Sequence, residues 1–138
     1  MIEKHLEALK AALAGVAPVY VVAVSEATPA LPYLLIEPGP GASGPDISLC
    51  DESANLDLSI RLKAVAASPT AALRVIENAK ARLSPLAAWM PLIVAGRNAE
   101  LRWLRHEADY TDTQVALVAT NRLVSLSVDS YRMVSTPA

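Results

Sequence analysis

The clearest pattern along the chain is a strict alternation of apolar and polar side chains between residues 56 and 64. Leu56, Leu58, Ile60, Leu62 and Ala64 have one parity, and Asp57, Ser59, Arg61 and Lys63 have the other. Successive side chains of a strand point to opposite faces of its sheet. The pattern therefore predicts a long β-strand with one buried and one hydrated face.

Two segments show apolar residues at helical spacing. The first predicts a helix over about residues 2–14, ended by Gly15, which adopts the left-handed conformation easily. The second predicts a helix over about 69–83, with Ser68 as its N-cap and Pro85 beyond its end. Val19–Val24 and then Tyr33–Ile36 lie between the first helix and the long strand. Both runs predict strands buried on two faces.

The C-terminal third predicts more strands from weaker patterns. Short extended segments are expected at about 92–95, 100–106 and 113–119, before a last strand at 122–134. In that last strand the apolar parity changes near Asp129, after which Tyr131 and Met133 carry the apolar character. A bulge would explain the change, and so would a strand that meets a second apolar surface, such as a neighbouring subunit.

Residues 37–53 hold three of the five glycines and three of the ten prolines of the chain. We expect a long surface loop here. Loops of more than about 12–15 residues are uncommon in compact domains and often functional, so Ile47 and Leu49 are candidate partner contacts. The alternative is a mobile excursion without a function.

These elements predict one α+β domain over residues 1–138. Its sheet should be mixed but mainly antiparallel, with two α-helices packed on one face and the long Gly/Pro loop at the surface. The other face should be polar or covered by a partner. The 53% apolar content favours partial cover and therefore oligomerisation.

Composition and charge exclude several classes of protein. The apolar fraction excludes intrinsic disorder, and the single Cys50 excludes an internal disulfide and is typical of a reducing, cytoplasmic setting. No apolar run approaches the ~20 residues that span a bilayer, and the amphipathic start is unlike a signal peptide. Twelve Lys and Arg against fourteen Asp and Glu lack the basic excess of a dedicated nucleic-acid binder.

The sequence contains no enzyme signature. His106, Glu107 and Asp109 form the one cluster of His and carboxylates, but their spacing suits a solvated turn better than a metal site. The glycines of residues 39–44 lack the Lys-Ser/Thr of a phosphate loop, and Cys50 is flanked by two carboxylates that would raise its thiol pKa. We therefore expect no catalytic, cofactor-binding or metal-binding residues. His5, among charges on the first helix, is expected at the surface.

Arginines are common between residues 97 and 132. Arg102 and Arg105 flank Trp103, and on a strand they do not form one basic stripe with the others. The ordinary interpretation is a strand edge with solvated arginines. The alternative is a contact with a neighbouring subunit or with DNA.

Several phrases resemble the tail terminator (tail completion, minor tail) proteins of long-tailed bacteriophages. They are the opening helix before Pro18-Val19-Tyr20, the segment Leu31–Ile36, the Gly/Pro loop, the strand Leu56–Leu62, a helix rich in Ala and Arg, and the ending Thr120–Arg132. The resemblance covers about residues 2–134. None of these phrases is a catalytic motif.

The resemblance implies a non-enzymatic α+β subunit of the virion tail or neck, assembled in the host cytoplasm. It implies a ring, commonly of six copies, that ends the tail tube and joins it to the head. The implied partners are other copies of the chain, the tail tube protein and a head–tail connector protein, while DNA only passes through the lumen and no membrane is involved. A ring subunit must hide an apolar flank in a head-to-tail contact, for which Tyr131 and Met133 are the candidates.

Two other functions stay open. The first is another neck or head–tail connector protein of the same particle, which sequence does not separate from a terminator. The second is a small cytoplasmic ligand-binding domain or enzyme, whose only candidate groups are His106, Glu107 and Asp109.

Overall fold

A computed structural model describes residues 2–22, 24, 29–38, 55–115 and 121–138. Its helices are α1 (Ile2–Ala12), α2 (Pro69–Leu83) and the short 3₁₀ helix η1 (Pro85–Ala87). Its strands are β1 (Val19–Val21), β2 (Tyr33–Pro38), β3 (Leu56–Ala66), β4 (Met90–Leu92), β5 (Arg97–Val115) and β6 (Asn121–Pro137). The side chains of residues 112–115 and 121–122 are not described.

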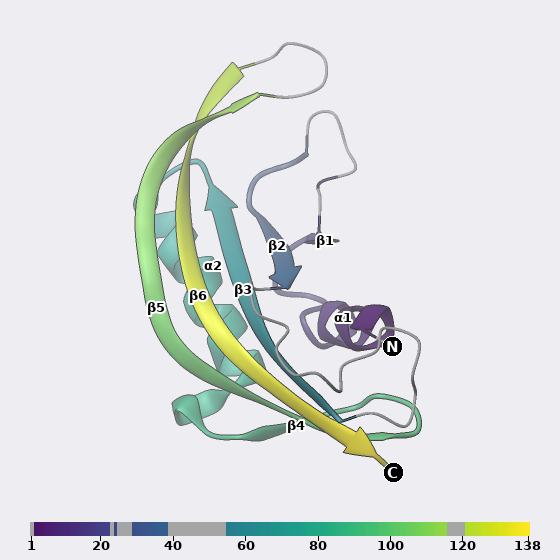
Figure 1. The fold of residues 1–138 in the computed structure, drawn as a ribbon. Coiled ribbons are helices and arrows are strands. Elements are labelled where there is room, and N and C mark those ends of the chain that lie inside the picture. The colour runs from purple at the N-terminus through teal and green to yellow at the C-terminus, as the bar shows by residue number, and fades with distance from the viewer. Residues whose placement is uncertain (1, 23, 25–28, 39–54, 116–120) are drawn as a thin grey trace.

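The strands form one curved six-stranded sheet in the order β1-β2-β3-β6-β5-β4 (Figure 1). Only the β1–β2 pair is parallel; the other pairs are antiparallel. The mixed, mainly antiparallel α+β fold predicted from the sequence is confirmed.

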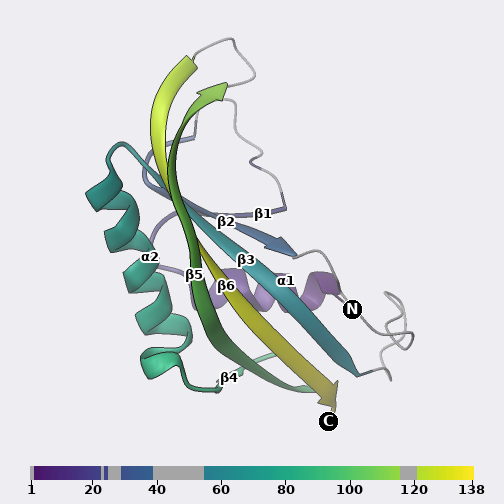
Figure 2. The same cartoon turned by 60° about the vertical axis from the view of Figure 1, so that its left-hand side comes forward.

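Both helices pack on the same face of the sheet, as predicted. Figure 2 shows α1 and α2 beside the sheet. The alternating residues of β3 from Leu56 to Ala64 are buried in one core with apolar side chains of both helices. Ser68 caps α2 by accepting a hydrogen bond from the Ala71 N–H at 3.2 Å, and Gly15 has a φ of +90° just after α1. The local signals in the sequence therefore define both helices well.

A second, smaller apolar cluster lies on the opposite face of the sheet. Tyr33, Val65 and Val124 form it, with Tyr20 and Leu126 packed against them. Val65 has the parity of the polar side chains of β3, so this cluster is on the face away from the helices. It explains the change of apolar parity in β6, because the strand contributes to the core on each face in turn.

The register of β6 with β3 excludes a bulge in that strand, which was one of the two explanations for its change of apolar parity. β6 pairs with β3 without interruption from Ser135 to Ser125, and the irregularities lie in β5, between Trp103 and Arg105 and between His106 and Ala108. β5 is also one strand of 19 residues where the sequence predicted two short ones with a turn at 106–112. That predicted turn is wrong, because pairing with β6 continues through it.

Three smaller predictions need correction. β1 ends at Val21 and is a half-buried edge strand, because β2 is its only neighbour in the described sheet. The strand expected at 92–95 lies at Met90–Leu92. Glu37 and Pro38, assigned to the loop at 37–53, belong to β2, and the rest of that loop, residues 39–53 with Ile47 and Leu49, is outside the described residues.

β5 and β6 extend past the end of β3 as a two-stranded arm, which both views show (Figures 1 and 2). β3 ends at Ala66, which pairs with Ser125 of β6. Beyond that pair, residues 112–115 of β5 pair only with residues 121–124 of β6. We call residues 112–115 and 121–124 the arm.

Candidate interaction surfaces

Tyr131 and Met133, the interface candidates of the sequence, lie in the core. They are 1% and 0% exposed, and they pack with apolar residues of both helices. Burial raises the pKa of the Tyr131 phenol far above its usual value, and its hydroxyl has no hydrogen-bond partner among the described residues. Neither side chain is accessible to a second subunit, so this assignment is wrong.

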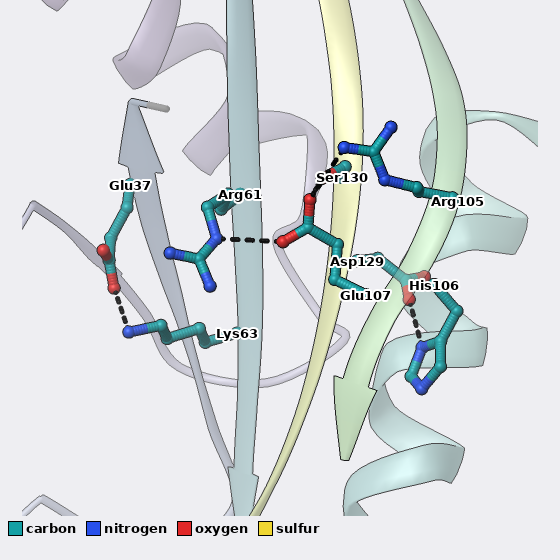
Figure 3. Close-up of polar contacts among 8 residues, drawn as sticks. All are labelled: Glu37, Arg61, Lys63, Arg105, His106, Glu107, Asp129 and Ser130. Carbon is teal, nitrogen blue, oxygen red and sulfur yellow. Dashed lines mark hydrogen bonds and ion pairs between the residues drawn. The ribbon is translucent and has the colours of Figure 1, made fainter. Parts of the chain in front are cut away.

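Arg102 and Arg105 are exposed, as the sequence predicted. Arg105 has a role in a polar network on the face away from the helices, where Glu107 is the central group (Figure 3). One oxygen of Glu107 lies 3.2 Å from Nε of Arg61, the other lies 3.4 Å from Arg105, and the Ser130 hydroxyl donates to it. The Ser130 hydrogen bond and the two arginines hold the pKa of Glu107 below its usual value.

The same face carries two more ion pairs between neighbouring strands. Lys63 of β3 lies 2.7 Å from Glu37 of β2, and Arg132 of β6 contacts both oxygens of Asp57. The Arg132 hydrogen bond lowers the pKa of Asp57. These cations therefore face carboxylates. The surface carries mixed charge, whereas a surface that attracts DNA carries a basic stripe.

His106 belongs to a network on the helix side of the sheet. Its Nδ1 lies 2.6 Å from Asp129, its Nε2 lies 3.0 Å from Asp109, and Asp129 also accepts a 2.9 Å hydrogen bond from the Trp103 indole N–H. The hydrogen bonds to Asp129 and then Asp109 raise the pKa of His106. The Ser127 hydroxyl donates to Asp109, and this bond and His106 lower the pKa of Asp109.

This network is closed on itself. Both ring nitrogens of His106 face carboxylates. Two hydrogen bonds to carboxylates require the imidazolium form of the ring, because only that form has two N–H donors. The two carboxylates lie on opposite sides of the ring, so they do not converge on one metal position with it. Among the described residues no three His, Cys, Asp or Glu side chains gather as a metal site.

His5 is fully buried, where the sequence predicted a surface residue. Its Nε2 lies 2.8 Å from the Ser135 hydroxyl, which also accepts a 2.9 Å hydrogen bond from Nε of Arg97. The helical spacing of Leu6 and Leu9 gives no indication of this contact, because it joins residues 130 positions apart.

A feature that the sequence analysis missed follows α2. No charged residue occurs between Arg82 and Arg97, and most of the residues in 85–93 are exposed. Leu86 is 98% and Ile93 93% exposed, and Trp89 and Met90 are more than one third exposed. We call residues 85–93 the apolar turn; the available signal in the sequence was the uncharged run itself.

A cavity of about 250 Å³ lies near the other end of α2, next to the arm. Pro69 and Leu73 of α2 line it, together with residues 109–111 of β5 and 125–127 of β6. Leu73 is 39% exposed, and Leu123 of the arm is 70% exposed. We call Leu73, Leu123 and this cavity the arm-side hollow.

β5 also has an unpaired edge. β4 pairs only with Ala99–Leu101, so residues 102–115 of β5 have no strand on their outer side among the described residues. The Ser84 hydroxyl accepts a hydrogen bond from the Trp103 N–H there, at 3.0 Å. Bulges and charged side chains along this edge are the usual protection against uncontrolled strand pairing.

No protein-family model matches the sequence, and no curated protein matches it. No described helix has the length and apolar character needed to cross a bilayer. Among solved structures, the chain is similar to a chain of "Virion of native gene transfer agent (GTA) particle", with a TM-score of 0.42 and 15% identity over 96% of this chain and 91% of that one.

Proposed function

We propose that this protein is a structural subunit of a phage tail, a tail terminator that forms a ring, commonly of six copies. The ring would end the tail tube and join it to the head. Its partners would be other copies of the chain, the tail tube protein and a connector protein, and it would act in the virion neck after assembly in the host cytoplasm. No catalytic activity belongs to this proposal.

The apolar turn is the observation that supports this proposal most. Four large apolar side chains are exposed within this nine-residue segment, which favours an interaction site because their exposure to water is unfavourable unless a partner covers them. Leu86 and Ile93 are almost fully exposed in a segment without any charge. The resemblance of several sequence segments to tail terminators supports a ring at the end of the tail tube as the kind of assembly.

The mixed-charge face is compatible with a lumen through which DNA passes. Arg61 and Arg105 share Glu107, and Lys63 faces Glu37, so cations there are balanced by carboxylates on neighbouring strands. A ring lined by such a surface would bind phosphates weakly, because few uncompensated charges release counterions.

Light scattering coupled to size exclusion, with negative-stain imaging of the main peak, tests the ring. We expect a species of about six chain masses, or a monomer that converts to a ring when tail tubes are added. A chain that stays monomeric with and without tubes at every concentration contradicts the proposal. Binding to a head portal, with no binding to tubes, would instead identify another neck protein.

A second candidate function is supported by Asp109, which links His106 to the cavity. Asp109 lines the cavity and also contacts Nε2 of His106, so a small ligand there would be near a titratable pair. Ligand screening by thermal shift, with His106→Ala as the comparison, tests this candidate. A binding profile that the substitution leaves unchanged removes its support.

A further inference from the structure

The second register irregularity of β5 brings two titratable side chains onto one face of the sheet. In the pairing with β6, His106 is opposite Asp129 and Asp109 is opposite Ser127. Residues three apart on a regular strand point to opposite faces, and the extra residue Glu107 removes that alternation. The bulge therefore places His106 and Asp109 together on the helix side, with Nε2 of the ring 3.0 Å from the carboxylate.

Glu107 itself is held on the opposite face of the sheet. It contacts Arg61 of β3 and Arg105 of its own strand, and it accepts a hydrogen bond from the Ser130 hydroxyl; Figure 3 shows it directed toward Arg61. Arginines stay charged at every pH that a folded protein experiences, so these contacts do not depend on a proton near neutral pH. The helix side of the bulge does depend on one, through His106.

The two carboxylates that contact His106 differ in their access to water. The Asp129 side chain is 5% exposed and also accepts a hydrogen bond from the Trp103 indole, whereas the Asp109 side chain is 51% exposed. A neutral ring keeps one N–H. That N–H stays directed at Asp129, because a buried carboxylate loses more when its donor leaves than one that water reaches.

Loss of the second proton therefore occurs at Nε2 of His106, which faces Asp109. A deprotonated Nε2 has a lone pair and no hydrogen, so it and the carboxylate oxygen are two acceptors that repel each other at 3.0 Å. Asp109 already lines the cavity of the arm-side hollow. Turning into that cavity gives its carboxylate water in exchange for the lost hydrogen bond.

The charged groups of α2 that face this part of β5 leave the two aspartates as the direct partners of the ring. Nζ of Lys80 lies 3.9 Å from the centre of the Trp103 ring, and Glu77 is three residues earlier on the same side of the helix. Among the described residues neither of them makes an ion pair with His106. The hydrogen bonds to the aspartates raise the pKa of His106, so the ring loses its proton above the usual pH for histidine.

We propose that His106 is a proton-dependent switch at the bulge of β5. In the protonated state the ring joins Asp109 to Asp129 across the bulge. When Nε2 gives its proton to water, Asp109 separates from the ring, and residues 108–111 of β5, next to the arm, open more easily. This inference goes beyond the proposed function and does not depend on the ring assembly, because all of its groups belong to one protomer.

An NMR titration between about pH 5 and pH 9 tests whether Asp109 follows the proton of His106. The chain has two histidines, so comparison with His106→Gln assigns the two ring signals. We expect the carboxyl carbon of Asp109 to shift at the same pH midpoint as the His106 ring, in addition to its own titration in acid. An Asp109 signal that does not move at this midpoint would overturn the proposal.

Asp109→Asn tests the contact from the other side. Its amide oxygen still accepts from Nε2–H but carries no full charge, so the proton affinity of His106 should fall by about 3–10-fold. Asp57→Asn is the matched control, since it removes a carboxylate that pairs with Arg132 on the opposite face, and the His106 midpoint should stay unchanged. A midpoint that Asp109→Asn leaves unchanged, or that both substitutions lower equally, would contradict the switch.

Native-state hydrogen exchange measures the opening of residues 108–111. After correction for the intrinsic exchange rate, the protection of their hydrogen-bonded amides should fall by about 3–10-fold between about pH 6 and pH 9, relative to the amides of β3. In His106→Gln this fall should be absent, because glutamine does not titrate. The same fall in both chains, or none in the wild type, would show that the proton of His106 does not control the bulge.

Discussion

Replacing Asp129 by alanine tests whether the hydrogen bonds of Asp129 to Trp103 and His106 hold β5 to β6 where the β5–β6 register is irregular. The Asp129 side chain is 5% exposed and accepts hydrogen bonds from the Trp103 indole at 2.9 Å and from His106 at 2.6 Å. Alanine removes both acceptors at the point where β5 bulges. A partly buried indole N–H is then left without a partner.

The expected loss follows from these two bonds. A hydrogen bond to a charged group contributes roughly 1.5–3 kcal/mol, and a buried donor without a partner costs a similar amount. The His106 side chain is 38% exposed, so water replaces much of its hydrogen bond to Asp129. This bond therefore contributes less to the free energy of unfolding than a buried one would. We therefore expect Asp129→Ala to lower the free energy of unfolding by about 2–4 kcal/mol, a large part of the ~5–15 kcal/mol of a typical domain.

Urea unfolding at neutral pH, followed by tryptophan fluorescence, measures this loss. Asp57→Ala is the matched control: Asp57 is paired with Arg132 on the exposed face, and we expect no measurable change. Asp129→Asn should fall between the two, because its amide oxygen still accepts from Trp103. A loss in Asp129→Ala no larger than in Asp57→Ala would refute the assignment of a structural role to the network.

Three further predictions follow from individual residues. Tyr131→Phe should raise the free energy of unfolding by about 1 kcal/mol, because it removes a buried hydroxyl without a partner among the described residues; a loss on urea unfolding would show that the hydroxyl is satisfied. The stability advantage of the wild type over His106→Gln should be largest below about pH 6.5 and decline as pH rises through the raised folded pKa, since a raised pKa stabilises the protonated state; an advantage that grows toward about pH 9 would contradict the His106 pairing. Leu86→Gly should leave the melting temperature of the chain nearly unchanged or raise it, because glycine relieves the left-handed strain, and should still weaken the self-association of the proposed ring in sedimentation; unchanged self-association would contradict a role of the apolar turn in the ring.

Short-range patterns predicted the elements that local interactions determine. The alternation in β3 and the helical spacing of α2 both depend on residues that are neighbours in sequence, and the Ser68 cap acts within its own helix. Their boundaries agree with the structure within about two residues. The long β5 was different, because pairing with β6 overrides the polar character of residues 106–112.

The periodicity of the sequence did not show that the interface candidates Tyr131 and Met133 are buried, for a related reason. Tyr131 and Met133 change parity relative to Val124 and Val128, and the sequence does not show that β6 serves two cores, one on each face of the sheet. Only the tertiary arrangement shows that this change is internal to the protomer. The exposure of Leu86 and Ile93 also depends on where the chain places the segment after α2, since an uncharged run is equally typical of a buried one.

Growth of tail tubes in the presence of the purified chain tests the central claim most directly. Tube subunits are polymerised with and without the chain, and the lengths and ends of the tubes are recorded by electron microscopy. If the protein is a tail terminator, tube growth stops early and a ring of the chain is visible at one end of each tube. Tubes that reach the same length with bare ends at saturating concentrations of the chain would contradict the claim.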